Sequence, residues 1–265
     1  MVVLKRDNQQ TYAHQWNVVV VIPARNEEKT ISASIHSVLH AIESASRRIH
    51  RSKVVVVADH CSDSTVPIVT STSRGNPSVY LVECNEGNVA RARSVGVDAG
   101  RGLLGPYDST TMWVASTDAD TVVPDDWISR QLALADLRNE GVAGLVDVHE
   151  YPDLPDSAAR HFTAHYTSKI PRTGSHPHVH AANLGFRLDA YDRAGGWGGL
   201  SRSEDRDLWT RLERTGASLI AAADLRVVTS GRGVGRVPGG FADWLREHVS
   251  ARDEYETESA REMSR

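Results

Sequence analysis

Short runs of apolar residues recur along the first 120 residues, separated by segments of helical periodicity. The first run, over 18–22, is β-branched at every position and does not alternate with polar residues. This pattern is typical of a strand covered on both faces, as in a parallel sheet. Similar runs predict strands over 53–58, 79–83 and 112–117, and apolar spacing predicts helices over 29–49, 66–73 and 88–100. The alternation predicts a doubly wound α/β fold with a mostly parallel central sheet.

The pattern is less regular after residue 120. The segment 149–180 has no clear periodicity, and a connection of this length is usually a lid or a binding segment. Asp125 and Asp126 are expected to cap the first helix of this half. The remaining spacing predicts helices over 127–137, 190–194, 206–216 and 241–251, and strands over 141–148, 183–188, 219–222 and 226–229.

The fourth predicted strand ends in two carboxylates, Asp118 and Asp120. Side chains two residues apart in an extended segment point the same way, and ligands bind at the carboxyl ends of strands in open α/β sheets. Hard oxygen ligands of this kind suit Mg²⁺ or Mn²⁺. Residues 124–126 also favour an Asp-rich turn. The residues of this segment are compatible with both a metal site and a turn.

Composition excludes several other classes. The net charge of −4 gives no basic surface for nucleic acid, so no nucleic-acid partner is expected. The two cysteines, Cys61 and Cys84, form neither a disulfide framework nor a zinc ribbon, which favours a cytoplasmic setting. No apolar run is long enough to span a bilayer. No Gly-x-Gly-x-x-Gly follows the first strand, so the dinucleotide-binding fingerprint is absent.

Five segments carry a resemblance to a known family. Ile-Pro-Ala-Arg-Asn-Glu (22–27) follows the first strand, and Ala-Asp-His-Cys-Ser-Asp-Ser-Thr (58–65) follows the second. Asn-Val-Ala-Arg-Ala-Arg-Ser-Val-Gly (88–96) opens the third helix. Thr-Asp-Ala-Asp (117–120) is an Asp-x-Asp motif, and Gly-Gly-Trp (195–197) precedes Ser-Glu-Asp-Arg-Asp-Leu (203–208). Together they resemble glycosyltransferase family 2, with Ser94 where the family usually has Asn.

The resemblance implies the GT-A fold, in a single domain over 17–250. A nucleotide-binding half (17–120) would be followed by an acceptor-binding half (121–250), with an N-terminal lead-in over 1–16 and a charged tail over 251–265. The partners implied are a nucleotide-diphosphate sugar, linked to UDP or GDP, and an acceptor that the sequence does not identify. The cofactor implied is a divalent metal, Mn²⁺ or Mg²⁺.

Residue roles also follow from the resemblance. Asp120 would be the principal metal ligand, with Asp118 beside it. Asp205 would be the catalytic base, supported by Glu204, and the helix N-terminus is expected to keep Asp205 ionised. The residues that would bind the donor are Pro23, Ala24, Asn26, Glu27, Asp59, Arg93 and Asp118.

Several of these residues have a structural alternative. Asp59 could cap the short helix that follows it, and Glu204-Asp205 could be a helix cap. Arg91 and Arg93 lie two positions apart on the predicted third helix, so only one of them is expected to point inward.

Three further residues are candidates for the sugar or acceptor site: His180, Trp197 and Arg232. His180 ends a run in which histidines alternate (176–180), and that run could instead form a structural zinc site. Arg232 belongs to a Gly- and Arg-rich stretch (229–236). This stretch could close over a diphosphate or be a solvated loop.

We therefore expect a metal-dependent glycosyltransferase that moves a sugar from its nucleotide-diphosphate donor to a hydroxyl acceptor. Inversion is expected from the resemblance, and non-processive transfer from the lack of transmembrane runs and of a Gln-x-x-Arg-Trp motif. One alternative is a sugar nucleotidyltransferase, which would need a Gly-rich basic loop after the first strand. Another is a non-catalytic nucleotide-sugar binding or scaffold protein. The apolar side of the 241–251 helix could serve a homodimer.

Overall fold

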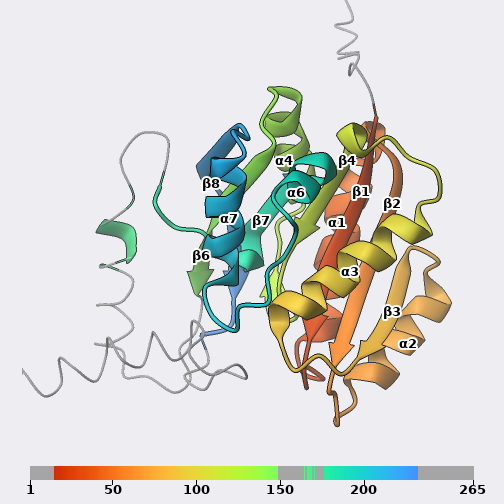
Figure 1. The fold of residues 1–265 in the computed structure, drawn as a ribbon. Coiled ribbons are helices and arrows are strands. Elements are labelled where there is room, and N and C mark those ends of the chain that lie inside the picture. The colour runs from red at the N-terminus through yellow and green to blue at the C-terminus, as the bar shows by residue number, and fades with distance from the viewer. Residues whose placement is uncertain (1–14, 149–163, 165, 169, 171–175, 232–265) are drawn as a thin grey trace, which may run out of the picture.

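A computed structural model describes residues 15–148, 164, 166–168, 170 and 176–231 (Figure 1). Arg232, the helix expected over 241–251 and the charged tail lie outside the described residues. The predictions of a loop over the diphosphate and of a homodimer through the last helix fall there as well.

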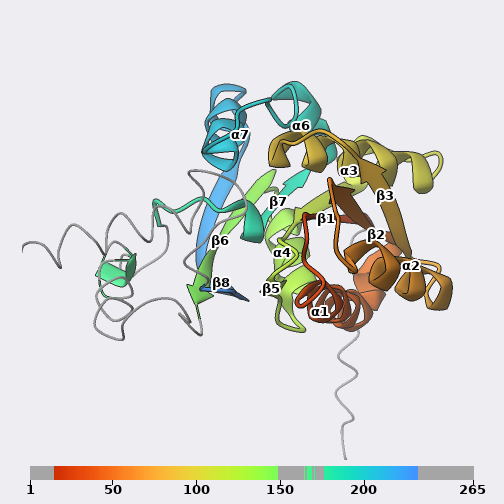
Figure 2. The same cartoon turned by 90° about the horizontal axis from the view of Figure 1, so that it is seen from below.

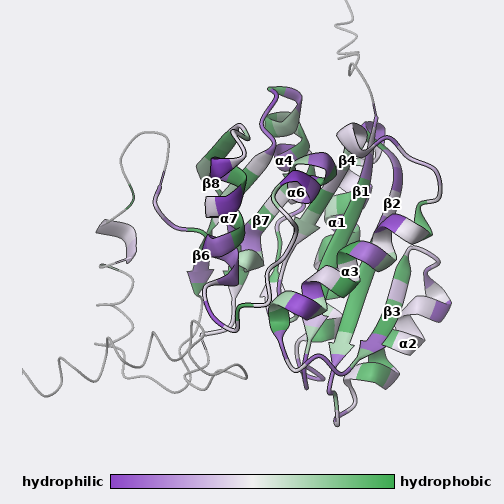
Figure 3. Cartoon of the chain, in the orientation of Figure 1, coloured by the Kyte–Doolittle hydropathy of each residue, from purple (hydrophilic) through white to green (hydrophobic). Residues whose placement is uncertain are grey.

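The first half is the parallel α/β unit that the apolar runs predict. Strands β1 (Trp16–Ala24), β2 (Ile49–Asp59), β3 (Val79–Cys84) and β4 (Met112–Ser116) pair in parallel, in the order β3-β2-β1-β4. Helices α1 (Ile31–Ser44) and α2 (Thr65–Gly75) cover one face, and α3 (Val89–Leu103) covers the other (Figures 1 and 2). Where both faces are covered, the strands are apolar: β1 along most of its length and β2 over 54–58 (Figure 3).

The second half extends the same sheet with mixed strand directions. It contains β5 (Thr121–Val122), α4 (Trp127–Asp136), β6 (Gly141–Val148), β7 (Leu184–Arg187), α6 (Leu188–Arg193), α7 (Glu204–Arg214) and β8 (Leu219–Thr229). The full order is β3-β2-β1-β4-β7-β6-β8-β5, and β7 is antiparallel to both of its neighbours. Three 3-10 turns, η1 (Ser46–Arg48), η2 (Ser109–Thr111) and η3 (Ala181–Asn183), precede β2, β4 and β7.

The structure corrects three local predictions. The helix expected over 29–49 ends at Ser44, and Ile49 already begins β2. The two strands expected over 219–222 and 226–229 are one strand, β8, and the gap between them is a register shift opposite Gly144 and Leu145 of β6. Asp126 precedes α4, but its side chain makes no capping hydrogen bond.

Two glycines let α3 lie directly on the sheet. A Cβ at Gly96 would lie 2.4 Å from Val21 Cγ1, and one at Gly100 would lie 2.4 Å from Val19 Cγ1. Such distances are far inside van der Waals contact, so only glycine permits this approach. The close packing fixes the height of α3 above β1 and therefore the reach of the side chains on its inner face.

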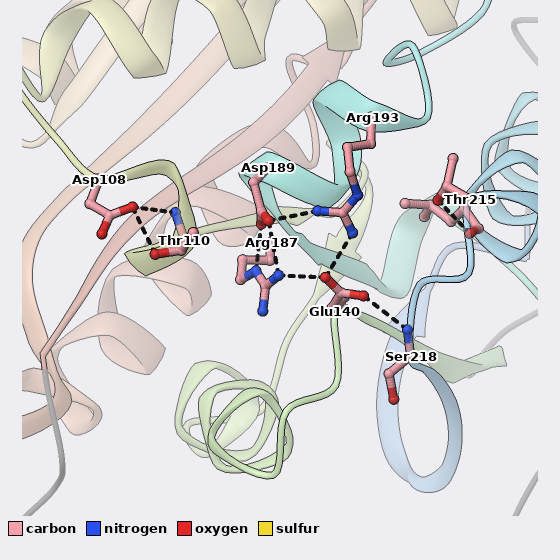
Figure 4. A network of polar contacts seen from close by, with 9 residues as sticks. Asp108, Thr110, Glu140, Arg187, Asp189, Arg193, Thr215 and Ser218 are labelled. Atoms are coloured by element: carbon pink, nitrogen blue, oxygen red, sulfur yellow. Dashed lines mark hydrogen bonds and ion pairs between the residues drawn. The ribbon is translucent and has the colours of Figure 1, made fainter.

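A network of polar side chains lies at the start of β6 and links it to the segments that precede α6 and β8 (Figure 4). The Glu140 carboxylate accepts hydrogen bonds from Arg187, from Arg193 at 2.8 Å and from the Ser218 N–H at 3.1 Å. Asp189 pairs with the same two arginines. Glu140 directly precedes β6, so the network lies at the opposite end of the sheet from the carboxylates that follow β4 and contributes to the fold.

Among the helices that the structure describes, none has the length and apolar character needed to cross a membrane.

Candidate active site

The predicted donor residues gather at the carboxyl ends of β1, β2 and β4. Pro23 and Ala24 end β1, Asp59 ends β2, and Asp118 lies two residues beyond β4. Since these three strands are parallel neighbours, their ends form one edge of the sheet, which is where open α/β sheets bind ligands.

The loops after β1 and β2 are tied to each other by hydrogen bonds. The Asn26 side-chain oxygen accepts from the Ser62 N–H at 2.7 Å, and the Thr65 hydroxyl accepts from the Glu27 N–H at 2.7 Å. Asn26 has a left-handed backbone, with φ of 56°, which asparagine tolerates better than most residues. The two loops therefore form one rim of the site. Contacts of the donor with Pro23, Ala24, Asn26 and Glu27 stay predictions.

Asp59 is buried and joins β2 to the start of α3. Its carboxylate accepts hydrogen bonds from His60 Nδ1 at 2.9 Å and from the Gly87 N–H at 3.1 Å. Burial raises the pKa of Asp59, but these hydrogen bonds outweigh burial and hold the pKa below its usual value. Ser64, not Asp59, occupies the N-cap of α2, so the capping alternative is wrong. The contact of Asp59 with a base stays a prediction.

Arg93 is the inward-facing arginine of α3. Arg93 is 3% exposed, whereas the Arg91 side chain is 63% exposed, so the expectation that one of the two points inward is confirmed. Arg93 Nη2 donates to Asp118 Oδ1 at 2.6 Å, and Nη1 donates to Glu204 Oε1 at 2.7 Å. The guanidinium also lies 5.3 Å from the ring centre of Trp197. Both terminal nitrogens therefore engage carboxylates of this chain, and a contact of Arg93 with a diphosphate stays a prediction.

The segment that holds Asp118 and Asp120 is a turn. The Thr121 N–H donates to the Asp118 carbonyl at 3.1 Å, and the Ser34 hydroxyl of α1 donates to the same oxygen at 3.0 Å. On the other side, the Thr229 hydroxyl lies 3.4 Å from Asp120 Oδ1. Sequence reasoning missed Ser34, although a serine on the apolar face of a helix is the signal that could have found it.

The carboxylates at this end of the sheet suit a divalent cation. Asp118, Glu204 and Asp205 lie around one buried guanidinium, so negative charge is in excess. Mg²⁺ and Mn²⁺ prefer such hard oxygen ligands, and Mg²⁺ is usually held by one or two carboxylates together with phosphate oxygens. Within the described ranges, no group of three or more His, Cys, Asp or Glu side chains could hold a metal. A metal here would therefore depend on the oxygens of a bound diphosphate as well as on Asp120 and Asp118.

Asp205 lies in the first turn of α7. Its two carboxylate oxygens accept from the Arg206 N–H at 2.7 Å and from the Ala181 N–H at 3.2 Å. Burial, reinforced by the neighbouring charge of Glu204, raises the pKa of Asp205 to about 6. The helix N-terminus is expected to keep Asp205 ionised, and the backbone hydrogen bonds do lower its pKa, but burial outweighs them and the pKa is raised. A pKa near neutrality suits a general base.

Glu204 and Asp205 do not cap α7. Ser203 occupies the N-cap position with a left-handed backbone and makes no side-chain capping bond. Glu204 instead pairs with Arg93, and Asp205 points to the backbone N–H that precedes β7. The helix-cap alternative for this pair is therefore wrong.

Two of the three candidate acceptor residues are described. Trp197 is 7% exposed, and its backbone N–H donates to the Tyr191 hydroxyl at 2.9 Å, to which Ser94 is also hydrogen-bonded. Burial lowers the pKa of His180 to about 3, so its ring is neutral at physiological pH. The ring of His180 lies 5.9 Å from that of His178, nearly parallel to it. Acceptor roles for Trp197 and His180 stay predictions.

Comparisons with known proteins agree on one family. The family model described as glycosyl transferase family 2 matches residues 19–195. A rice protein (Oryza sativa subsp. japonica) named Probable glucomannan 4-beta-mannosyltransferase 3 is 29% identical over 79% of this chain. That match spans 39% of the rice protein.

Solved structures show the same fold at low identity. A mannosyltransferase from Pyrobaculum calidifontis, in complex with GDP-Man and Mn²⁺, has a TM-score of 0.61 and 20% identity over 82% of this chain and 58% of its own. S. aureus TarS 1-349 in complex with UDP has a TM-score of 0.57 and 16% identity over 81% of this chain and 60% of its own.

The fold is that of GT-A glycosyltransferases, as expected, and the family model matches well over half of the chain. The chain belongs to glycosyltransferase family 2.

Proposed function

We propose that this glycosyltransferase moves a sugar from a nucleotide-diphosphate sugar to a hydroxyl acceptor, with inversion and without processivity. The observation that carries the proposal is Asp205, a half-buried carboxyl with a pKa of about 6 beside the ion pair of Glu204 and Arg93. Arg93 also pairs with Asp118, which follows β4. The candidate base therefore lies near the edge of the sheet where the donor is predicted to bind.

A divalent metal is part of the proposal. Asp120, with Asp118, would hold it together with the donor diphosphate. When bound, the metal acts as a Lewis acid that stabilises the negative charge developing on the leaving diphosphate. The chain's own contribution is to hold Asp120, through the hydroxyl of Thr229 and the N–H of Ser230.

Asp205 would take the proton from the acceptor hydroxyl as the new glycosidic bond forms. In an inverting displacement the acceptor attacks from the side opposite the leaving group, so one carboxylate base is sufficient. The N–H groups of Ala181 and Arg206 orient the carboxylate.

GDP-mannose is the first donor to test. The rice relative is named a mannosyltransferase and the P. calidifontis structure contains GDP-Man, whereas the TarS structure contains UDP, which keeps UDP-sugars as the second set. The cytoplasmic setting rests on the cysteines alone, both of which are free thiols.

The test is release of nucleoside diphosphate from GDP-mannose and from UDP-sugars with Mn²⁺, in the presence of a panel of hydroxyl acceptors. We expect turnover with one donor, its loss in Asp205→Asn, and its retention in Asp125→Asn, an exposed aspartate of the same domain. Comparing the anomeric configuration of the product with that of the donor by NMR tests inversion. Absence of turnover with every donor, or full activity of Asp205→Asn, would overturn the proposal.

A further inference from the structure

Arg93 connects the two halves of the domain inside the site. It lies on α3, in the first half, and binds Glu204 at the first residue of α7, in the second half. Its other terminal nitrogen holds Asp118, beyond the end of β4. One side chain thus fixes the start of α7 relative to the carboxyl edge of the parallel strands.

Arg93 is held in place by its two carboxylate partners and by the packing around it. The backbone of α3 lies close on the sheet at Gly96, one turn further along, which packs on Val21. The ring of Trp197 lies beside the guanidinium, and Trp197 is itself fixed by its hydrogen bond to Tyr191. An arginine that bridges two carboxylates in a rigid setting fixes their relative positions as well as neutralising part of their charge.

We propose that Arg93 is a positioning residue for the base: by holding Glu204 against the end of β4, it fixes the first turn of α7 and with it the orientation and charge state of Asp205. Asp205 directly follows Glu204, so displacement of the helix start moves its carboxylate. The inference rests on the proposed function, because it assigns Arg93 a role in that reaction other than binding the donor.

The charges near Asp205 predict in which direction its pKa should change when each of them is removed. The negative charge of Glu204 disfavours ionisation of Asp205, and the positive charge of Arg93 favours it. His180, next to the Ala181 that hydrogen-bonds Asp205, is neutral, and Arg206 contributes its backbone N–H. Loss of the Arg93 charge and loss of the Glu204 charge should therefore shift the titration of Asp205 in opposite directions.

The test compares four variants with the wild-type chain: Arg93→Met, Arg93→Lys, Glu204→Gln and the control Arg91→Met. The control makes the same substitution two residues away on the same helix, at an exposed side chain. Two quantities are measured in each. One is the titration of the Asp205 carboxyl by ¹³C NMR without substrates, assigned with Asp205→Asn. The other is the pH profile of kcat and the affinity for the donor.

We expect Arg93→Met to raise the Asp205 titration midpoint by roughly one pH unit and Glu204→Gln to lower it. Arg93→Lys should restore part of the wild-type midpoint. Displacement of the base by about 1 Å can cost about 100-fold in rate, so kcat should fall by about that factor in Arg93→Met, and by more than any loss of donor affinity that follows from releasing Asp118. Arg91→Met should behave as the wild type.

An unchanged midpoint in Arg93→Met, or a loss confined to donor affinity, would overturn the inference and return Arg93 to donor binding. Should Arg93→Met not fold, Arg93→Lys decides, since it loses the paired hydrogen bonds to Asp118 and Glu204 and must show a midpoint above that of the wild type together with a lower kcat. Absence of turnover in the wild type would refute the proposed function instead. The NMR titration then still tests whether Arg93 controls Asp205.

Discussion

The raised pKa of Asp205 makes a prediction about folding stability that does not depend on knowing the substrate. A carboxyl whose pKa is raised from 3.8 to about 6 by folding stabilises the native state while it is protonated. This contribution is fully present below the unfolded-state value and is lost as the pH rises through about 6. An asparagine at the same position does not titrate, so Asp205→Asn removes this pH dependence.

The size of the effect follows from the two pKa values. The free energy of unfolding of Asp205→Asn minus that of the wild type should increase by about 2 kcal/mol between pH 4.5 and pH 7. Asparagine has only one acceptor oxygen for the N–H groups of Ala181 and Arg206, which costs about 1 kcal/mol at every pH. The slope of the difference with pH is therefore the test, not its absolute value.

The measurement is urea denaturation followed by tryptophan fluorescence at several pH values, with Asp125→Asn as the control. The control aspartate is exposed, so its difference from the wild type should stay nearly flat over this range. A flat or falling difference for Asp205→Asn would refute the conclusion that burial raises its pKa, and would remove the main support for its role as a base near neutral pH.

Three further predictions concern the framework of the site and are tested by urea denaturation. Gly96→Ala should destabilise the protein by about 1 to 3 kcal/mol, because its Cβ would meet Val21, whereas Gly102→Ala on the same helix meets nothing within 4 Å and should be neutral or stabilising. Equal effects would contradict the packing argument. Asn183→Ala should cost about 3 kcal/mol, since its side chain makes three buried hydrogen bonds. A loss of stability smaller than that of an average surface substitution would contradict the stabilising role of these three hydrogen bonds. Glu140→Gln should cost about 1 kcal/mol, less in 1 M salt, because it weakens two arginine pairs. A loss independent of salt would exclude an electrostatic origin.

The sequence predicted the parallel half of the sheet well, because its strands are covered on both faces and therefore read as uninterrupted apolar runs. The prediction was wrong where spacing alone was ambiguous. Ile49 falls in helical register with Ile42, yet the chain turns at η1 and Ile49 begins β2. The gap expected between two short strands before residue 226 is a register shift within β8, where the segment Ala-Asp-Leu (223–225) contains the exposed Asp224 and interrupts the regular strand pattern.

Long-range contacts at the site could not be predicted from local pattern. Nothing near Arg93 in the sequence indicates that its partners are Asp118 and Glu204, because the pairing depends on how α7 returns over the sheet. For the same reason the raised pKa of Asp205 was not predicted. The helix position was visible in the sequence, but the burial that outweighs it was not.

The most direct test of the central claim is metal-dependent binding of a nucleotide-diphosphate sugar, measured as the shift in unfolding free energy with Mn²⁺ and with EDTA. With one donor at 100 times its Kd, the wild type and Asp125→Asn should gain about 2.7 kcal/mol, and this gain should vanish with EDTA and in Asp120→Asn. Absence of stabilisation by any donor, or an equal gain in Asp120→Asn and in EDTA, would contradict the account.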